Sequence, residues 1–207
     1  DADTQALAAG ASVTDVFTVR VADGLGGYSE LDVTVNVTGT NDAPVITVET
    51  GDSQAESVQE SDAENLTTTG TLTLSDVDAD DSVSLTVTGV SASGTLGVFT
   101  ETDSTLADML SITAGSPLAT GAGNASGQAT WTFDSGTETF DYLGAGESIT
   151  LAYTVTADDG DATDTETVTV TVNGTNDRPE IVVEGTDSAT GSLSESTDLM
   201  GGNLETS

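Results

Sequence analysis

The chain contains an internal repeat, and this repeat constrains the possible folds more than any other feature. Residues 39–44 read GTNDAP and residues 174–179 read GTNDRP, an offset of 135 (174 − 39). Upstream, residues 7–14 (LAAGASVT) return as 143–150 (LGAGESIT), an offset of 136 (143 − 7). Self-similarity at a fixed period is typical of tandem domains. We therefore predict the C-terminal part of one repeat (1–44), a complete repeat (45–179) and the N-terminal part of a third (180–207).

Apolar and polar residues alternate along many segments of the complete repeat. Ile149, Leu151, Tyr153 and Val155 alternate with small or polar residues, and 168–172 show the same pattern. This period of two indicates strands with one buried face, and valine and threonine, which dominate them, suit a pleated sheet. About seven short strands separated by Gly, Asp, Asn and Ser predict an all-β, immunoglobulin- or cadherin-like antiparallel β-sandwich. Residues 105–110 are expected to form one helical turn.

The charge of the chain excludes several classes of function. It has 36 acidic and 2 basic residues, a formal net charge of −34, and neither cysteine nor histidine. Thiolate chemistry, catalytic triads and Cys/His zinc sites are therefore impossible. Two arginines cannot neutralise a phosphate backbone, so nucleic acid is not an expected partner. No apolar run is long enough to insert into a membrane as a helix.

Three acidic segments are predicted to converge at one end of the complete repeat. Alternating strand directions place the loop at 75–81, the loop at 158–161 and the linker from the preceding repeat at the same end. The candidate ligands there are Asn41, Asp42, Asp76, Asp78, Asp80, Asp158 and Asp159. Carboxylate and amide oxygens in flexible geometry suit calcium better than magnesium, which demands a strict octahedron. We therefore predict bound Ca²⁺ as the cofactor.

The quoted segments resemble a known family. GTNDAP at 39–44, the upstream ADG at 22–24, GTLTLSDVD at 70–78 and ATWTF at 129–133 are similar to parts of VCBS repeats. The resemblance covers nearly the whole chain and is weakest over 91–127. It implies a cadherin-like sandwich in a large bacterial adhesin of the RTX or biofilm type. It also implies type I secretion, an extracellular or cell-surface location, and calcium between repeats.

The resemblance to cadherins implies how the ligands are shared between two junctions. The ligands at the first junction would be Asn41, Asp42, Asp76, Asp78 and Asp159. The ligands at the second junction would be Glu60, Asn176 and Asp177. Arg178 replaces the alanine at position 43 and puts a cation beside the second site. That second site is expected to be weaker.

The expected function is that of a calcium-stiffened spacer in a long adhesin or fibre, with neighbouring repeats as partners and an unknown surface receptor. One alternative is a carbohydrate- or peptide-binding module that uses residues 91–127. Another is a filament subunit in which segment 180–207 of one chain pairs with segment 1–44 of the next. We do not expect an enzyme, because no pair of carboxylates is singled out and no aromatic platform accompanies one.

Overall fold

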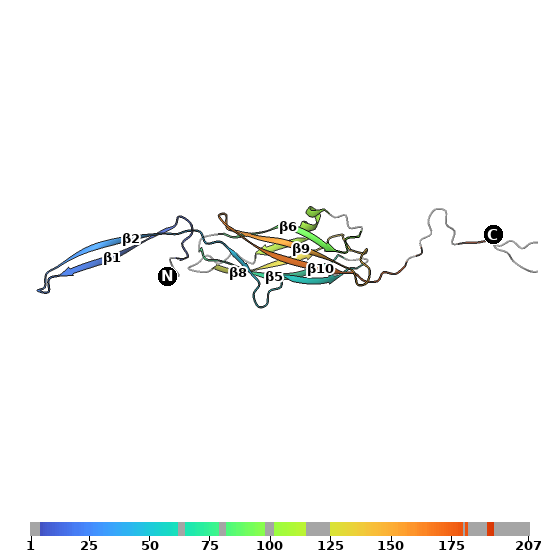
Figure 1. The fold of residues 1–207 in the computed structure, drawn as a ribbon, viewed down its shortest axis with the longest axis horizontal. Coiled ribbons are helices and arrows are strands. Elements are labelled where there is room, and N and C mark those ends of the chain that lie inside the picture. The colour runs from blue at the N-terminus through green and yellow to red at the C-terminus, as the bar shows by residue number, and fades with distance from the viewer. Residues whose placement is uncertain are drawn as a thin grey trace, which may run out of the picture. The chain divides into compact units, whose positions relative to one another are not determined.

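A computed structural model describes residues 5–61, 65–78, 82–97, 102–114, 125–179, 181 and 190–192. The chain divides into two compact units, Asp1–Asn176 and Asp177–Ser207. The described residues of the second unit form neither helix nor strand. All the described secondary structure therefore belongs to the first unit, which contains a two-stranded hairpin and a sandwich (Figure 1).

The sandwich consists of two four-stranded sheets. One has the order β3-β5-β8-β7, with bounds Val45–Thr47, Thr67–Asp76, Ala125–Asp134 and Leu110–Ala114. The other has the order β4-β10-β9-β6, with bounds Ala55–Gln59, Thr163–Asn173, Ser148–Asp158 and Ser84–Gly94. Every pairing is antiparallel except that of β4 with β10, which is parallel. This is the strand arrangement of an immunoglobulin-type sandwich, so the predicted fold class is confirmed.

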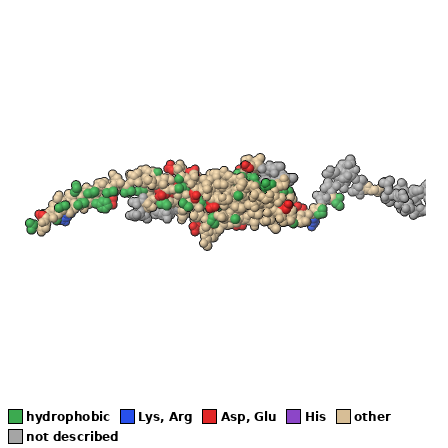
Figure 2. Space-filling model, viewed as in Figure 1, with side chains coloured by type: hydrophobic (Ala, Val, Ile, Leu, Met, Phe, Trp, Pro, Cys, Tyr) green, Lys and Arg blue, Asp and Glu red, His purple; other side chains and the backbone are tan. Residues whose placement is uncertain are grey.

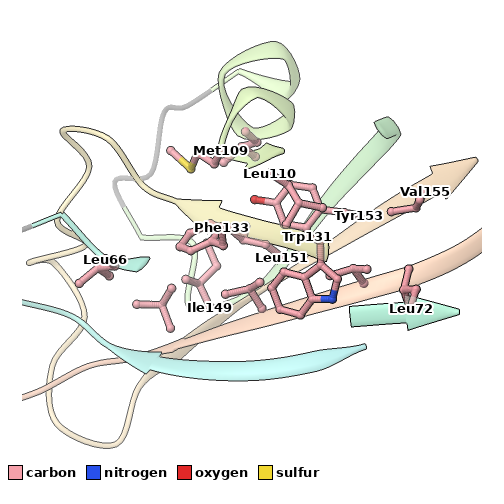
Figure 3. Packing of buried hydrophobic residues seen from close by; sticks show 14 of the residues in the cluster. Leu66, Leu72, Met109, Leu110, Trp131, Phe133, Ile149, Leu151, Tyr153 and Val155 are labelled. Atoms are coloured by element: carbon pink, nitrogen blue, oxygen red, sulfur yellow. The ribbon is translucent and has the colours of Figure 1, made fainter. Parts of the chain in front are cut away.

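The core consists of the inward-facing residues of both sheets. Trp131 and Phe133 of β8 and Tyr153 of β9 are fully buried, with ring centroids of Phe133 and Tyr153 6.5 Å apart (Figure 3). In β9 every second residue from Ile149 to Ala157 is buried, as the sequence pattern predicts. The indole N–H of Trp131 donates to the carbonyl oxygen of Ser53 at 2.8 Å, which satisfies its one polar atom.

Three elements differ from the sequence-based expectation: β4 and β7, which were not expected as strands, and the helical turn. β4 was not expected, because 55–59 carries only one large apolar residue, Val58; it is an edge strand held by its backbone. The helical turn is present as α2, Asp103–Asp108, whose N-cap is Thr102. It ends earlier than expected, because Leu110 already pairs with Phe133 as the first residue of β7.

The hairpin repeats the geometry of β9 and β10. β1 (Ser12–Ala22) and β2 (Tyr28–Thr38) pair from Ser12↔Thr38 to Ala22↔Tyr28, and β9 and β10 pair from Ser148↔Asn173 to Asp158↔Thr163. The two registers are the same: adding 136 to the residue numbers of β1 and 135 to those of β2 gives the paired residues of β9 and β10. Each hairpin is followed by a glycine at an equivalent position: a Cβ on Gly39 would lie 2.1 Å from the Leu7 carbonyl oxygen, and one on Gly174 would lie 2.2 Å from that of Leu143.

Candidate metal centre at the first linker

The carboxylates of Asp76 and Asp78 are the buried centre of the candidate site. Asp76 is the last residue of β5, and its Oδ1 accepts a hydrogen bond from the backbone N–H of Asp78 at 2.9 Å. Only 2% of Asp76 and 1% of Asp78 is exposed to solvent. Two ionised carboxylates this close to each other and to the protein interior are costly unless a positive charge compensates them.

The linker before β3 is hydrogen-bonded to this pair and to the turn between β9 and β10. The backbone N–H of Asp42 donates to Oδ2 of Asp78 at 2.8 Å. The side-chain amide of Asn41 donates to Oδ2 of Asp159 at 3.1 Å and to the carbonyl oxygen of Asp42 at 3.3 Å. Because the amide nitrogen of Asn41 makes these two hydrogen bonds, its Oδ1 is free to accept a further hydrogen bond or to bind a cation.

Asp159 is placed by its own turn. Its Oδ1 accepts from the backbone N–H groups of Asp161 at 2.7 Å and Ala162 at 2.6 Å. Burial raises the pKa of Asp159, but these two bonds and the one from Asn41 outweigh it, so that the pKa is lowered overall. Asp159 therefore contributes a carboxylate that stays ionised.

Three side-chain oxygens remain buried without a hydrogen-bond partner here: Oδ1 of Asn41, Oδ2 of Asp76 and Oδ1 of Asp78. Such an atom costs about 1–3 kcal/mol when left unpaired, and more when it is charged. Burial raises the pKa of Asp76, and the nearby carboxylate of Asp159 raises it further. The oxygens come from two carboxylates and one amide, which is the donor set that a hard cation such as Ca²⁺ prefers.

No basic side chain of the first unit neutralises this centre. Residues 1–176 contain one basic side chain, Arg20. It lies in β1, stacks on the ring of Tyr28 at 3.8 Å and pairs with Glu30 at 3.9 Å. Acidic side chains are scattered over the surface shown in Figure 2, with hardly any basic ones among them. A compensating charge at the linker would therefore have to come from outside the unit.

A second buried carboxylate lies at the opposite end of β10. Glu60 is 4% exposed, and its Oε1 accepts from the backbone N–H of Thr175 at 2.6 Å and from the Thr175 hydroxyl. Its Oε2 is buried without a hydrogen-bond partner. Asn176 ends the first unit and Asp177 begins the second. The structure thus brings Glu60 to the start of the second linker, and the role of Asn176 and Asp177 stays a prediction.

Asp158 does not join the hydrogen-bonded cluster. Asp80 lies outside the described residues. Asp158 is exposed, and its Oδ1 accepts from the N–H of Gly160 at 2.7 Å, within its own turn. Among the described residues, no group of three or more Asp, Glu, His or Cys side chains is already gathered in a metal-binding arrangement. The three unpartnered oxygens come from two carboxylates and the amide of Asn41.

Two acidic residues that matter for the fold were not singled out from the sequence. Oδ2 of Asp164 accepts from the backbone N–H of Ile46 at 2.8 Å and so ties β3 to β10. Asp52 accepts from Thr71, Thr73 and Gln128 and holds the loop between β3 and β4 against the sheet. Asp164 could have been found, because it occupies an inward-facing position in the period-two pattern of β10.

The comparisons with known proteins leave the family open. No protein-family model matches the chain, and no curated protein matches it with significant similarity. A solved structure described as the CooA pilin subunit from enterotoxigenic Escherichia coli is 16% identical, covering 60% of this chain and 91% of that one, with a TM-score of 0.38. Over the described residues, no helix is both long and apolar enough to cross a membrane.

Proposed function

We propose that the chain is a calcium-stiffened, non-catalytic spacer of a long extracellular bacterial adhesin or fibre. The single observation that carries this proposal is the set of three buried, unpartnered oxygens where the linker meets the sandwich. The resemblance to VCBS repeats and the repeated sequence support neighbouring repeats as partners. Type I secretion and a surface location belong to the same proposal.

The cation would act by holding the linker on the sandwich. Asn41 belongs to the linker, whereas Asp76, Asp78 and Asp159 belong to the sandwich. When bound, Ca²⁺ supplies the positive charge that the carboxylates lack. In its absence their mutual repulsion favours release of the linker, so the joint bends more easily.

Binding to the folded state alone also stabilises the sandwich. The gain is RT ln(1 + [L]/Kd), or about 2.7 kcal/mol at a ligand concentration of 100 Kd. This is a large part of the roughly 5–15 kcal/mol that stabilises a typical domain. The spacer is therefore expected to be stiff and stable at high calcium concentration, and flexible and less stable at low calcium concentration.

Calcium titration by calorimetry, combined with thermal unfolding in calcium and in chelator, tests the proposal. We expect calcium to raise the Tm, and Asp78→Asn to reduce both the affinity and the rise. Asp161→Asn is the matched control, because it removes the same charge from an exposed position beside the site. An unchanged Tm and hydrodynamic radius on adding chelator would contradict the proposal.

A second candidate function, head-to-tail assembly by strand exchange, is favoured by the exposed apolar face of the β1–β2 hairpin. Phe17 is 52% exposed, whereas its counterpart Tyr153 is 0% exposed. By the repeat offset, residues 190–194 of a second copy correspond to β4, which pairs in parallel with β10, the counterpart of β2. Such a contact links chains without closing a ring.

Light scattering over a range of concentrations separates this candidate from the first. Assembly predicts a mass that rises with concentration and that Leu193→Asp reduces, because Leu193 is the counterpart of Val58 in β4. A constant monomer mass would rule it out. The ligand-binding alternative stays a prediction, since much of 91–127 lies outside the described residues.

A further inference from the structure

The sandwich joins its second strand, β4, to its last strand, β10, in one parallel pair. β4 and β10 pair in register from Ala55↔Thr169 to Gln59↔Asn173. Backbone bonds extend this ladder at both ends: the N–H of Thr169 donates to the carbonyl of Gln54 at 2.8 Å, and the N–H of Glu60 donates to that of Asn173 at 3.0 Å. The ladder is thus continuous from the start of β4 to the end of β10.

The two linkers attach at opposite ends of β10. The incoming linker contacts the turn that precedes β10, through the Asn41–Asp159 hydrogen bond. The outgoing linker begins after Asn173, where Thr175 bonds to Glu60. β10 has 11 residues, so the two attachment points are separated by the length of that strand, roughly 36 Å at 3.3 Å per residue.

Tension through the linkers therefore acts along the strands. The incoming linker leads first into β3, which pairs with β5 through three residues and is bonded to Asp164 of β10. Once this short strand has detached, tension pulls the N-terminal end of β4 one way and the C-terminal end of β10 the other way, so the parallel strands must slide past each other. All the hydrogen bonds of the ladder then carry load together. In the β1–β2 hairpin the ends Ser12 and Thr38 are partners, so the same tension opens its bonds one after another.

Side-chain contacts secure both ends of the pair against sliding. At the outgoing end, Glu60 bonds to Thr175, and the side-chain amide of Asn173 donates to the carbonyl oxygen of Val58 at 3.3 Å. Before β4, the carbonyl oxygen of Ser53 accepts from the buried indole of Trp131. A Cβ on Gly70 would lie 2.4 Å from the Trp131 ring and 2.5 Å from that oxygen, so the loop is seated closely on the sheet.

We propose that the β4–β10 pair is the mechanical clamp that resists tension on this domain. The idea rests on the proposed spacer function, because tension requires neighbours attached at both ends. It adds a role for residues 54–60 and 169–175 that does not involve cation binding, apart from Glu60. The β1–β2 hairpin, pulled in the same chain, is an internal reference for sequential opening.

Single-molecule pulling tests the clamp. The chain has no cysteine, so cysteines added at both ends give unique anchors on the full protein. We expect a low-force event from the β1–β2 hairpin and a severalfold stronger event that releases the chain between Gln54 and Asn173. In a second variant the anchors are Ala55→Cys and Thr169→Cys, which are register partners. The force then acts perpendicular to the two strands and opens their hydrogen bonds one after another. The force on the same bonds should then fall severalfold; equal forces in both directions would overturn the clamp.

Proline substitutions provide a second test. Gln54 and Glu60 bond to β10 through their backbones, so alternation along the strand directs the backbone of Glu56 toward β10 and that of Ser57 away from it. Glu56→Pro should lower the end-to-end unfolding force severalfold and Ser57→Pro only slightly. Glu56→Ala controls for the Ser53–Glu56 side-chain bond. If both proline variants lower the unfolding force equally, the clamp proposal is wrong. If Glu56→Pro does not fold, the comparison of the two pulling directions still tests the proposal.

Repeating the pulls in chelator separates the clamp from the proposed function. A direction-dependent force that chelator leaves unchanged would support the clamp and contradict calcium stiffening. A chelator effect on linker compliance with equal forces in both directions would support calcium and contradict the clamp.

Discussion

The β1–β2 and β9–β10 hairpins have the same strand register and opposite environments. Tyr153 of β9 is 0% exposed, whereas Phe17, its counterpart in β1, is 52% exposed. The turns also match: Asp23 Oδ1 accepts from Leu25 and Gly27, as Asp159 Oδ1 accepts from Asp161 and Ala162. Register and turn are therefore local properties of the repeated sequence, while burial depends on the six other strands of the sandwich.

The largest expected difference between the hairpins concerns their aromatic residues. Tyr153→Ala should lower the free energy of unfolding by about 3–5 kcal/mol, because it leaves a cavity in a packed core. Phe17→Ala should change it by less than about 0.5 kcal/mol. Trp131, the one tryptophan, reports sandwich unfolding in a denaturant titration. Equal effects would show that the β1–β2 hairpin is buried in solution.

The two glycines that follow the hairpins sharpen the comparison. A Cβ on Gly174 would clash with the carbonyl oxygen of Leu143, so Gly174→Ala should destabilise the sandwich by about 1–3 kcal/mol. Gly39→Ala meets the same clash with Leu7 but has no core behind it. The denaturation midpoint followed by tryptophan fluorescence should move for Gly174→Ala and stay in place for Gly39→Ala.

The turn carboxylates should differ in calcium binding. Asp159→Asn keeps an Oδ1 that accepts from Ala162, but it removes the charge that faces Asn41. We expect a severalfold weaker calcium affinity by calorimetry. Asp23→Asn is the matched control in the equivalent turn of β1–β2. A loss of affinity in Asp23→Asn as large as that in Asp159→Asn would exclude the site described here.

The smallest expected effect is on the pH dependence of stability without calcium. The folded-state pKa of Asp76 is raised, so its ionised form opposes folding. Between that raised value and its unfolded value of about 3.9, protonation therefore increases the free energy of unfolding as the pH falls. Asp159, whose pKa is lowered, gives the opposite trend below about pH 4. Urea titrations in chelator should show the first trend, and Asp76→Asn should abolish it; a fall in stability that begins near neutral pH would contradict it.

Much of the sandwich and part of the site could be predicted from the sequence. Strand periodicity identified β9 and β10, and reversal of strand direction correctly placed Asn41, Asp76, Asp78 and Asp159 at one end. β4 could not be predicted in this way, because an edge strand with exposed alternate residues has no strong apolar pattern. Asp158 and Asp159 could not be distinguished from the sequence. The geometry of the turn directs Asp159 toward the linker, whereas Asp158 bonds to Gly160 within the turn.

The amino-acid sequence by itself determined the repeat and the excess of acidic groups, which are read directly from it. It also determined the alternating faces and the hairpin registers, because these depend on residues close together in the chain. Only the tertiary structure decided that Oδ1 of Asn41 and one oxygen each of Asp76 and Asp78 are buried without partners. It alone also decided that β4 lies parallel to β10. Both outcomes depend on the packing of segments far apart in the chain, as in the Asn41–Asp159 bond and the β4–β10 pairing, and no local pattern specifies such packing.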